Sequence, residues 1–72
     1  MEASDLKRPP FCVLTFRDGQ QVIAESVETE IAARTRFASA VDLCKTRDDA
    51  HVHHVELHAD SGMLDRWSST ST

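Results

Sequence analysis

The stretch FCVLTFRDGQQVIAES, residues 11–26, decides the fold, because it has the pattern of two β-strands joined by a tight turn. FCVLTF is rich in β-branched and aromatic residues, and QQVIAES follows it across Arg17-Asp18-Gly19. A three-residue loop with a left-handed Gly19 would pair Phe16 with Gln20. A two-residue Asp18-Gly19 loop would shift the pairing by one residue.

Both faces of this predicted hairpin carry apolar side chains. In the three-residue register, one face holds Cys12, Leu14, Phe16, Val22 and Ala24, and the other holds Phe11, Val13 and Ile23. One helix can cover only one face of a sheet. The sequence therefore predicts that a second surface covers the remaining face.

A helix is predicted over residues 28–46. Apolar side chains recur there at intervals of three or four, which makes a stripe of Val27, Ile31, Phe37, Ala38, Val41 and Leu43 or Cys44. Ser26 or Thr29 can supply the N-cap oxygen. Acidic residues precede the stripe and basic residues follow it, as the helix dipole favours.

The stretch HVHHVELHAD, residues 51–60, contains all four histidines and alternates as a strand does. The alternation places Val55, Leu57, Ala59 and His53 on the apolar face, and His54, Glu56 and His58 on the other. A turn at 60–62 leads into MLDRW, residues 63–67. A three-residue loop there pairs Ala59 with Met63, Glu56 with Arg66 and Val55 with Trp67.

The predicted order is ββαββ, an α+β two-layer domain with a four-stranded antiparallel sheet and one helix packed on one face. We expect a single domain at 11–67, with flexible tails at 1–10 and 68–72. A chain of 72 residues buries a small core and is marginally stable without a disulfide, a metal or a second subunit.

Composition narrows the function classes. Twelve acidic and eight basic side chains give a net charge of −4, which disfavours nucleic acid as a partner. No apolar run approaches the roughly 20 residues that span a bilayer. The chain has no export signal, so we expect a cytoplasmic protein with reduced Cys12 and Cys44. It has no nucleophile-elbow, phosphate-loop or metalloprotease motif, so we expect no enzyme activity, with an active site formed between subunits as the alternative.

The histidine cluster has two interpretations. His51, His53, His54 and His58 could bind zinc or copper, since neutral imidazole is a common ligand of both metals. The alternation nevertheless divides the four between two faces, which favours a solvated or interfacial role. Protonation of all four would bring the net charge from −4 to 0, so we also expect association or solubility to change between about pH 5 and 7.

The sequence thus predicts a non-catalytic, acidic interaction module of accessory or inhibitor type, with a metal-binding protein as the alternative. No cofactor is expected beyond that metal. The partner is a second copy of the chain, in a homodimer, or another protein. The predicted partner-binding residues are Phe11, Val13, Ile23, His54, Glu56, His58, Arg66 and Trp67.

Overall fold

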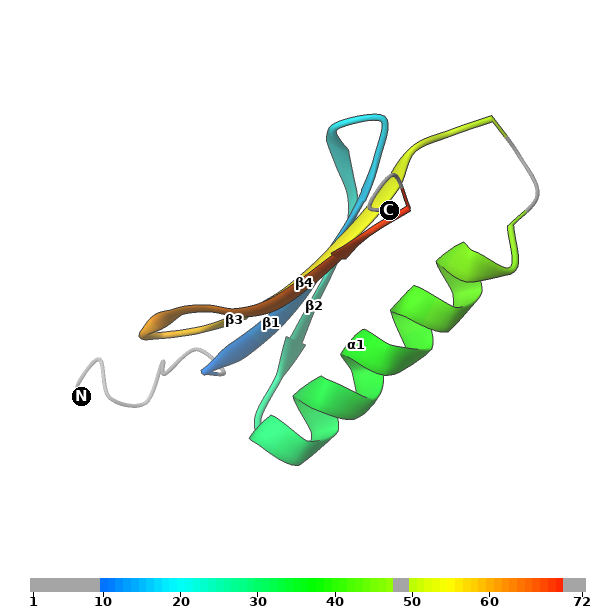
Figure 1. Cartoon of the computed structure of the whole chain (residues 1–72). Helices are drawn as coiled ribbons and strands as arrows, with labels where there is room; N and C mark the ends of the chain where they lie inside the picture. The colour runs from blue at the N-terminus through cyan, green and yellow to red at the C-terminus, as the bar shows by residue number, and fades with distance from the viewer. Residues whose placement is uncertain (1–9, 48–49, 70–72) are drawn as a thin grey trace, which may run out of the picture.

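The computed structural model describes residues 10–47 and 50–69, and it confirms the predicted ββαββ order (Figure 1). The predicted tails fall mostly outside these residues, at 1–9 and 70–72. The elements are β1 (Phe11–Arg17), β2 (Gln20–Val27), α1 (Glu30–Lys45), β3 (His53–Ala59) and β4 (Gly62–Ser68).

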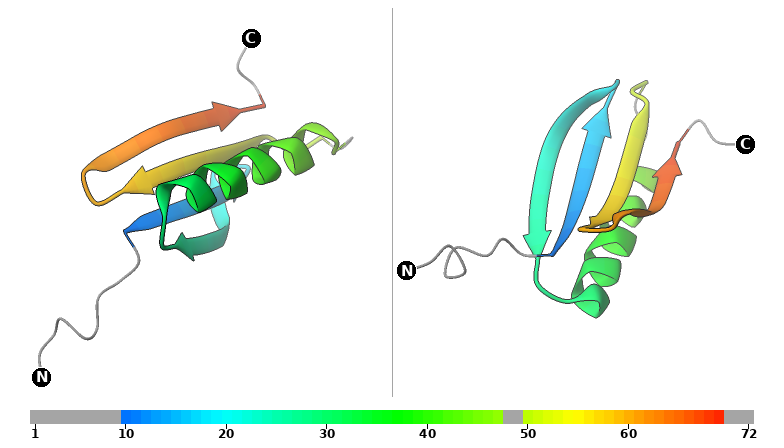
Figure 2. Two further views of the ribbon diagram at one scale, coloured as in Figure 1. Left: turned by 90° about the horizontal axis from the view of Figure 1, so that it is seen from below. Right: turned by 90° about the vertical axis from the view of Figure 1, so that its left-hand side faces the viewer.

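The four strands form one antiparallel sheet in the order β2-β1-β3-β4, with α1 across one face (Figure 2). β1 and β3 are the two central strands, although β2 and α1 separate them in sequence. Both hairpins therefore contribute one central strand and one edge strand. No helix in the described ranges is long and apolar enough to cross a membrane.

The first hairpin turns through two residues, Asp18 and Gly19, which is the shorter of the two loops that the sequence left open. Both have positive φ, 53° and 84°, which suits the mirror-image turns that match strand twist. Arg17 therefore pairs with Gln20. A register shift next to Phe16 then corrects the pairing further along the two strands.

That shift moves Val22 away from the face on which it was expected. Thr15 pairs with Ile23 and Leu14 with Ala24, so Val22 has no direct partner on β1. Val22 lines a groove on the helix side together with Ile23 and Thr15. The prediction for Val22 was wrong because the sequence does not reveal where a bulge falls.

The Asp18 carboxylate ties this turn to the segment that enters β3. Its Oδ1 accepts a hydrogen bond of 2.9 Å from the Val52 backbone N–H, and its Oδ2 lies 2.6 Å from His51 Nδ1. The Asp18 backbone N–H donates in turn to the Val52 carbonyl at 2.8 Å. Hydrogen bonding from Val52, reinforced by His51, lowers the pKa of Asp18 below the ordinary value of 3.8.

Thr29 caps α1, with its hydroxyl accepting from the Ala32 backbone N–H at 3.2 Å. The predicted stripe is confirmed in part, because Val27, Phe37, Val41 and Cys44 are buried or partly buried in the core. Ile31 is 82% exposed and Leu43 66% exposed. Alanines complete the contact face, with Ala33 buried and Ala32 and Ala40 partly buried against the core.

The core lies between α1 and the two central strands. Val13, Val55 and Leu57 have almost no exposed surface, and Val27 and the buried helix residues complete the cluster. Alanine at position 33 lets the helix backbone approach the sheet closely. The core is confined to one side of the sheet.

The second hairpin also turns through two residues, so Ala59 pairs with Gly62 and not with Met63 as expected. A register shift after Leu57 restores the rest of the predicted pairing. Glu56 lies opposite Arg66, and Val55 lies opposite Trp67. β4 continues to Ser68, one residue beyond the expected end.

Candidate functional site

The sheet face opposite α1 has no covering layer among the described residues (Figure 2). We call it the uncovered face. Cross-strand pairing aligns its side chains in rows, with Leu14 between Ala24 and Glu56. The face comprises Cys12, Leu14 and Phe16 from β1, Gln21, Ala24 and Ser26 from β2, His54, Glu56 and His58 from β3, and Met63, Arg66 and Ser68 from β4.

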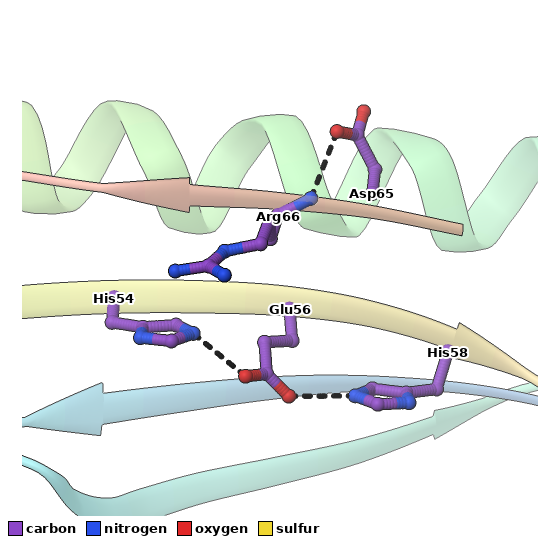
Figure 3. A network of polar contacts seen from close by, with 5 residues as sticks. All are labelled: His54, Glu56, His58, Asp65 and Arg66. Carbon is purple, nitrogen blue, oxygen red and sulfur yellow. Dashed lines mark hydrogen bonds and ion pairs between the residues drawn. The ribbon is translucent and has the colours of Figure 1, made fainter. Parts of the chain in front are cut away.

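A hydrogen-bonded histidine–glutamate–histidine row runs along β3 on this face (Figure 3). His54 Nε2 donates to Glu56 Oε2 and His58 Nε2 donates to Oε1, each at 2.7 Å. All three side chains are mostly buried. The exposed fraction is 18% for Glu56, 26% for His54 and 32% for His58. The i, i+2 spacing of a strand places all three on the same side.

The two imidazoles hold Glu56 in its ionised form. Hydrogen bonding from His58, the largest cause, and from His54 lowers the pKa of Glu56 below the ordinary value of 4.5, against the opposing effect of burial. A lowered pKa means that the folded state favours the carboxylate more than the unfolded chain does. Glu56 therefore stabilises the fold above pH 4.5, and this contribution is lost as pH falls through the folded-state pKa.

We expect Glu56→Gln to lower the free energy of unfolding at pH 6, and the difference from the native chain to shrink as the pH approaches 3. The reason is that only the native chain has a carboxylate at position 56, and this carboxylate becomes protonated on acidification. Urea denaturation of both chains at a series of pH values measures this difference. A difference that stays constant over the whole range contradicts the account.

Arg66 lies directly across from Glu56 but is not its ion-pair partner. The row on β3 already occupies both carboxylate oxygens. Figure 3 shows the Arg66 side chain extending along the sheet on the side of His54, and its backbone N–H donates to Asp65 Oδ1 at 2.8 Å. Within residues 10–47 and 50–69, the guanidinium has no ion-pair partner. The predicted cross-strand pairing of Glu56 with Arg66 is therefore confirmed, but the two side chains do not form an ion pair.

The structure divides the eight predicted partner-binding residues between the two sides of the sheet. His54, Glu56, His58 and Arg66 lie on the uncovered face. Val13 is 1% exposed and belongs to the core, Phe11 and Trp67 pack against that core, and Ile23 is half exposed on the helix side. Cys12, Leu14 and Phe16 share one face, as the alternation predicts, but they are not among the predicted partner-binding residues.

The four histidines do not converge on one point. His51 contacts Asp18 at the hairpin turn, His53 is buried on the helix side at 6% exposure, and His54 and His58 flank Glu56 on the uncovered face. In the part of the chain that the structure describes, no group of three histidine, cysteine or carboxylate side chains is placed to hold a metal ion. The metal alternative gains no support from this geometry.

Comparisons of the chain with protein-family models, with curated proteins and with solved structures find no match.

Proposed function

We propose that this protein is a non-catalytic interaction module whose uncovered face binds a second copy of the chain. The observation that carries the proposal is the composition of that face. The central strand β1 presents Cys12, Leu14 and Phe16 there, and α1 shields only the opposite side. Covering apolar surface stabilises by roughly 25 cal/mol for each Å² that is buried. Summed over a whole sheet face, this free energy is significant beside the small stability of a chain this short.

A second copy suits the charges of the uncovered face. Glu56 contributes one negative charge and Arg66 one positive charge, so two copies related by a two-fold axis present complementary groups to each other. The Arg66 guanidinium has no ion-pair partner in the described residues and can donate to a carboxylate of the other copy. The mostly buried Glu56 and its histidines add few unsatisfied groups at a contact, because they already bond to one another.

Cys12 provides a direct test, because it is half buried on the uncovered face, whereas Cys44 is 7% exposed on the side of α1 that packs against the sheet. We expect the rate at which excess maleimide reagent labels Cys12 to fall as protein concentration rises, since association covers this face. Cys44 should react slowly throughout, and Cys12→Ser should remove the fast phase. Mass spectrometry follows both sites.

A Cys12 labelling rate that does not change up to about 1 mM protein, where even weak dimers are populated, would contradict self-association. The accessory or inhibitor role would then require a different protein on this face.

We further propose a cytoplasmic location. No disulfide joins Cys12 and Cys44, which lie on opposite sides of the sheet. A fold that separates its two thiols, so that they form no disulfide with each other, suits a reducing compartment.

A further inference from the structure

A groove of about 270 Å³ runs between β2 and the C-terminal half of α1, on the side of the sheet away from the uncovered face. It exists because α1 packs over β1 and β3 and leaves the helix side of β2 open (Figure 2). Val22, Ile23 and Leu43 line it and are 48%, 50% and 66% exposed. The groove therefore combines apolar walls with open access.

Three arginines from three different segments line this groove. Arg17 ends β1, Arg36 lies in the middle of α1, and Arg47 follows the helix. Arg36 Nη1 lies 3.5 Å from Glu25 Oε2, in an exposed pair of a kind that contributes little and is readily exchanged. Neither Arg17 nor Arg47 has an ion-pair partner in the described parts of the chain. Glu25 also lines the groove, so three positive charges and one negative charge give it a net charge of +2, on a protein whose net charge is −4.

β2 forms one wall of the groove and is an edge strand. The outer side of an edge strand presents backbone N–H and C=O groups that can pair with another chain. The β2 sequence QQVIAESV contains no proline or lysine, which commonly protect such edges, and its protecting features are the bulge at Val22 and the charge of Glu25. An extended segment added at this edge would direct alternate side chains toward the helix.

We propose that the groove binds an extended peptide that adds to β2 as a fifth strand and carries both apolar and acidic side chains on the face that it turns toward α1. The apolar side chains contact Val22, Ile23 and Leu43, and the carboxylates pair with the arginines. A second copy of this chain is disfavoured here, because two grooves facing each other would bring their arginines together. The site lies across the sheet from the proposed dimer surface and does not depend on it.

The test titrates the full chain with two short capped peptides, one with the repeat Val-Ser-Glu-Ser and the other with the repeat Val-Ser-Lys-Ser. In each extended peptide one face presents valine and the charged side chain in turn, and the other face presents serine. We expect the glutamate peptide to shift the NMR amide signals of β2 and of the C-terminal half of α1, and to bind more weakly in high salt. The lysine peptide should leave these signals unchanged. The proposal is overturned if the glutamate peptide causes no shifts at about 1 mM, a level that detects weak binding, or if both peptides bind equally.

Two matched pairs of variants locate the binding. Arg47→Gln should weaken binding of the glutamate peptide about tenfold, as expected for loss of one charged hydrogen bond. Arg34→Gln changes the net charge equally but removes a side chain that bonds to Glu30, so it should have no effect. Leu43→Asp should weaken binding, and Ile31→Asp should not. Equal effects within either pair contradict the groove. Shifts of the groove signals with protein concentration alone would identify a second copy as the occupant.

Discussion

Replacing Leu57 by alanine is expected to lower the free energy of unfolding by about 3 kcal/mol, the largest effect on stability that we predict for a single substitution. Leu57 is 0% exposed and lies with Val13 and Val55 at the centre of the core. The cost combines lost burial with the cavity left behind. A chain of this size is stable by only about 4–10 kcal/mol, so a large share of its stability would be lost.

Urea denaturation followed by circular dichroism measures this change. Leu43→Ala is the matched control, because Leu43 loses the same atoms at a site that is 66% exposed, and we expect a change within about 0.5 kcal/mol. Similar losses for the two variants would mean that the core does not lie between α1 and the central strands.

Ala24→Arg is expected to abolish self-association while leaving the isolated subunit folded. Ala24 is exposed on the edge strand β2 and lies beside Leu14 on the uncovered face. A guanidinium placed there extends into solvent in the monomer. In the dimer it would be desolvated against apolar side chains, at a cost of about 3 kcal/mol, which corresponds to a more than 100-fold weaker dimer.

The matched control is Ile31→Arg, which adds the same charge at a position of α1 that is 82% exposed and lies on the opposite side of the sheet. Sedimentation velocity of both variants, with circular dichroism to verify folding, makes the comparison. A dimer that survives Ala24→Arg, or one that both variants weaken equally, is incompatible with association through the uncovered face.

The alternation of residues 53–59 was sufficient to predict the faces of β3, because one face is buried and the period of a strand is two. Val55 and Leu57 are buried as expected, and His54, Glu56 and His58 share the other face. The same spacing predicted that these three side chains lie next to one another. The sequence did not show that Glu56 would bond to both histidines, or that Arg66 would make no ion pair with Glu56.

Features that depend on neighbouring elements were beyond the sequence. Alternation assigns faces but not the strand that lies alongside, so the order β2-β1-β3-β4 was not predicted. The helix stripe was right for Phe37, Val41 and Cys44 but wrong for Ile31, because α1 packs partly through alanines and leaves Ile31 exposed. The groove was missed because its three arginines lie far apart in the sequence. Arg36 is 11 residues before Arg47, and Arg17 is 30 residues before it.

Sedimentation of the unmodified chain over a wide range of concentrations tests most directly the claim that a second copy covers the open side of the sheet. We predict that the measured mass rises with concentration from that of one chain to that of two and then stays constant, as a closed two-fold dimer requires. A mass that remains that of one chain at every concentration would contradict the claim.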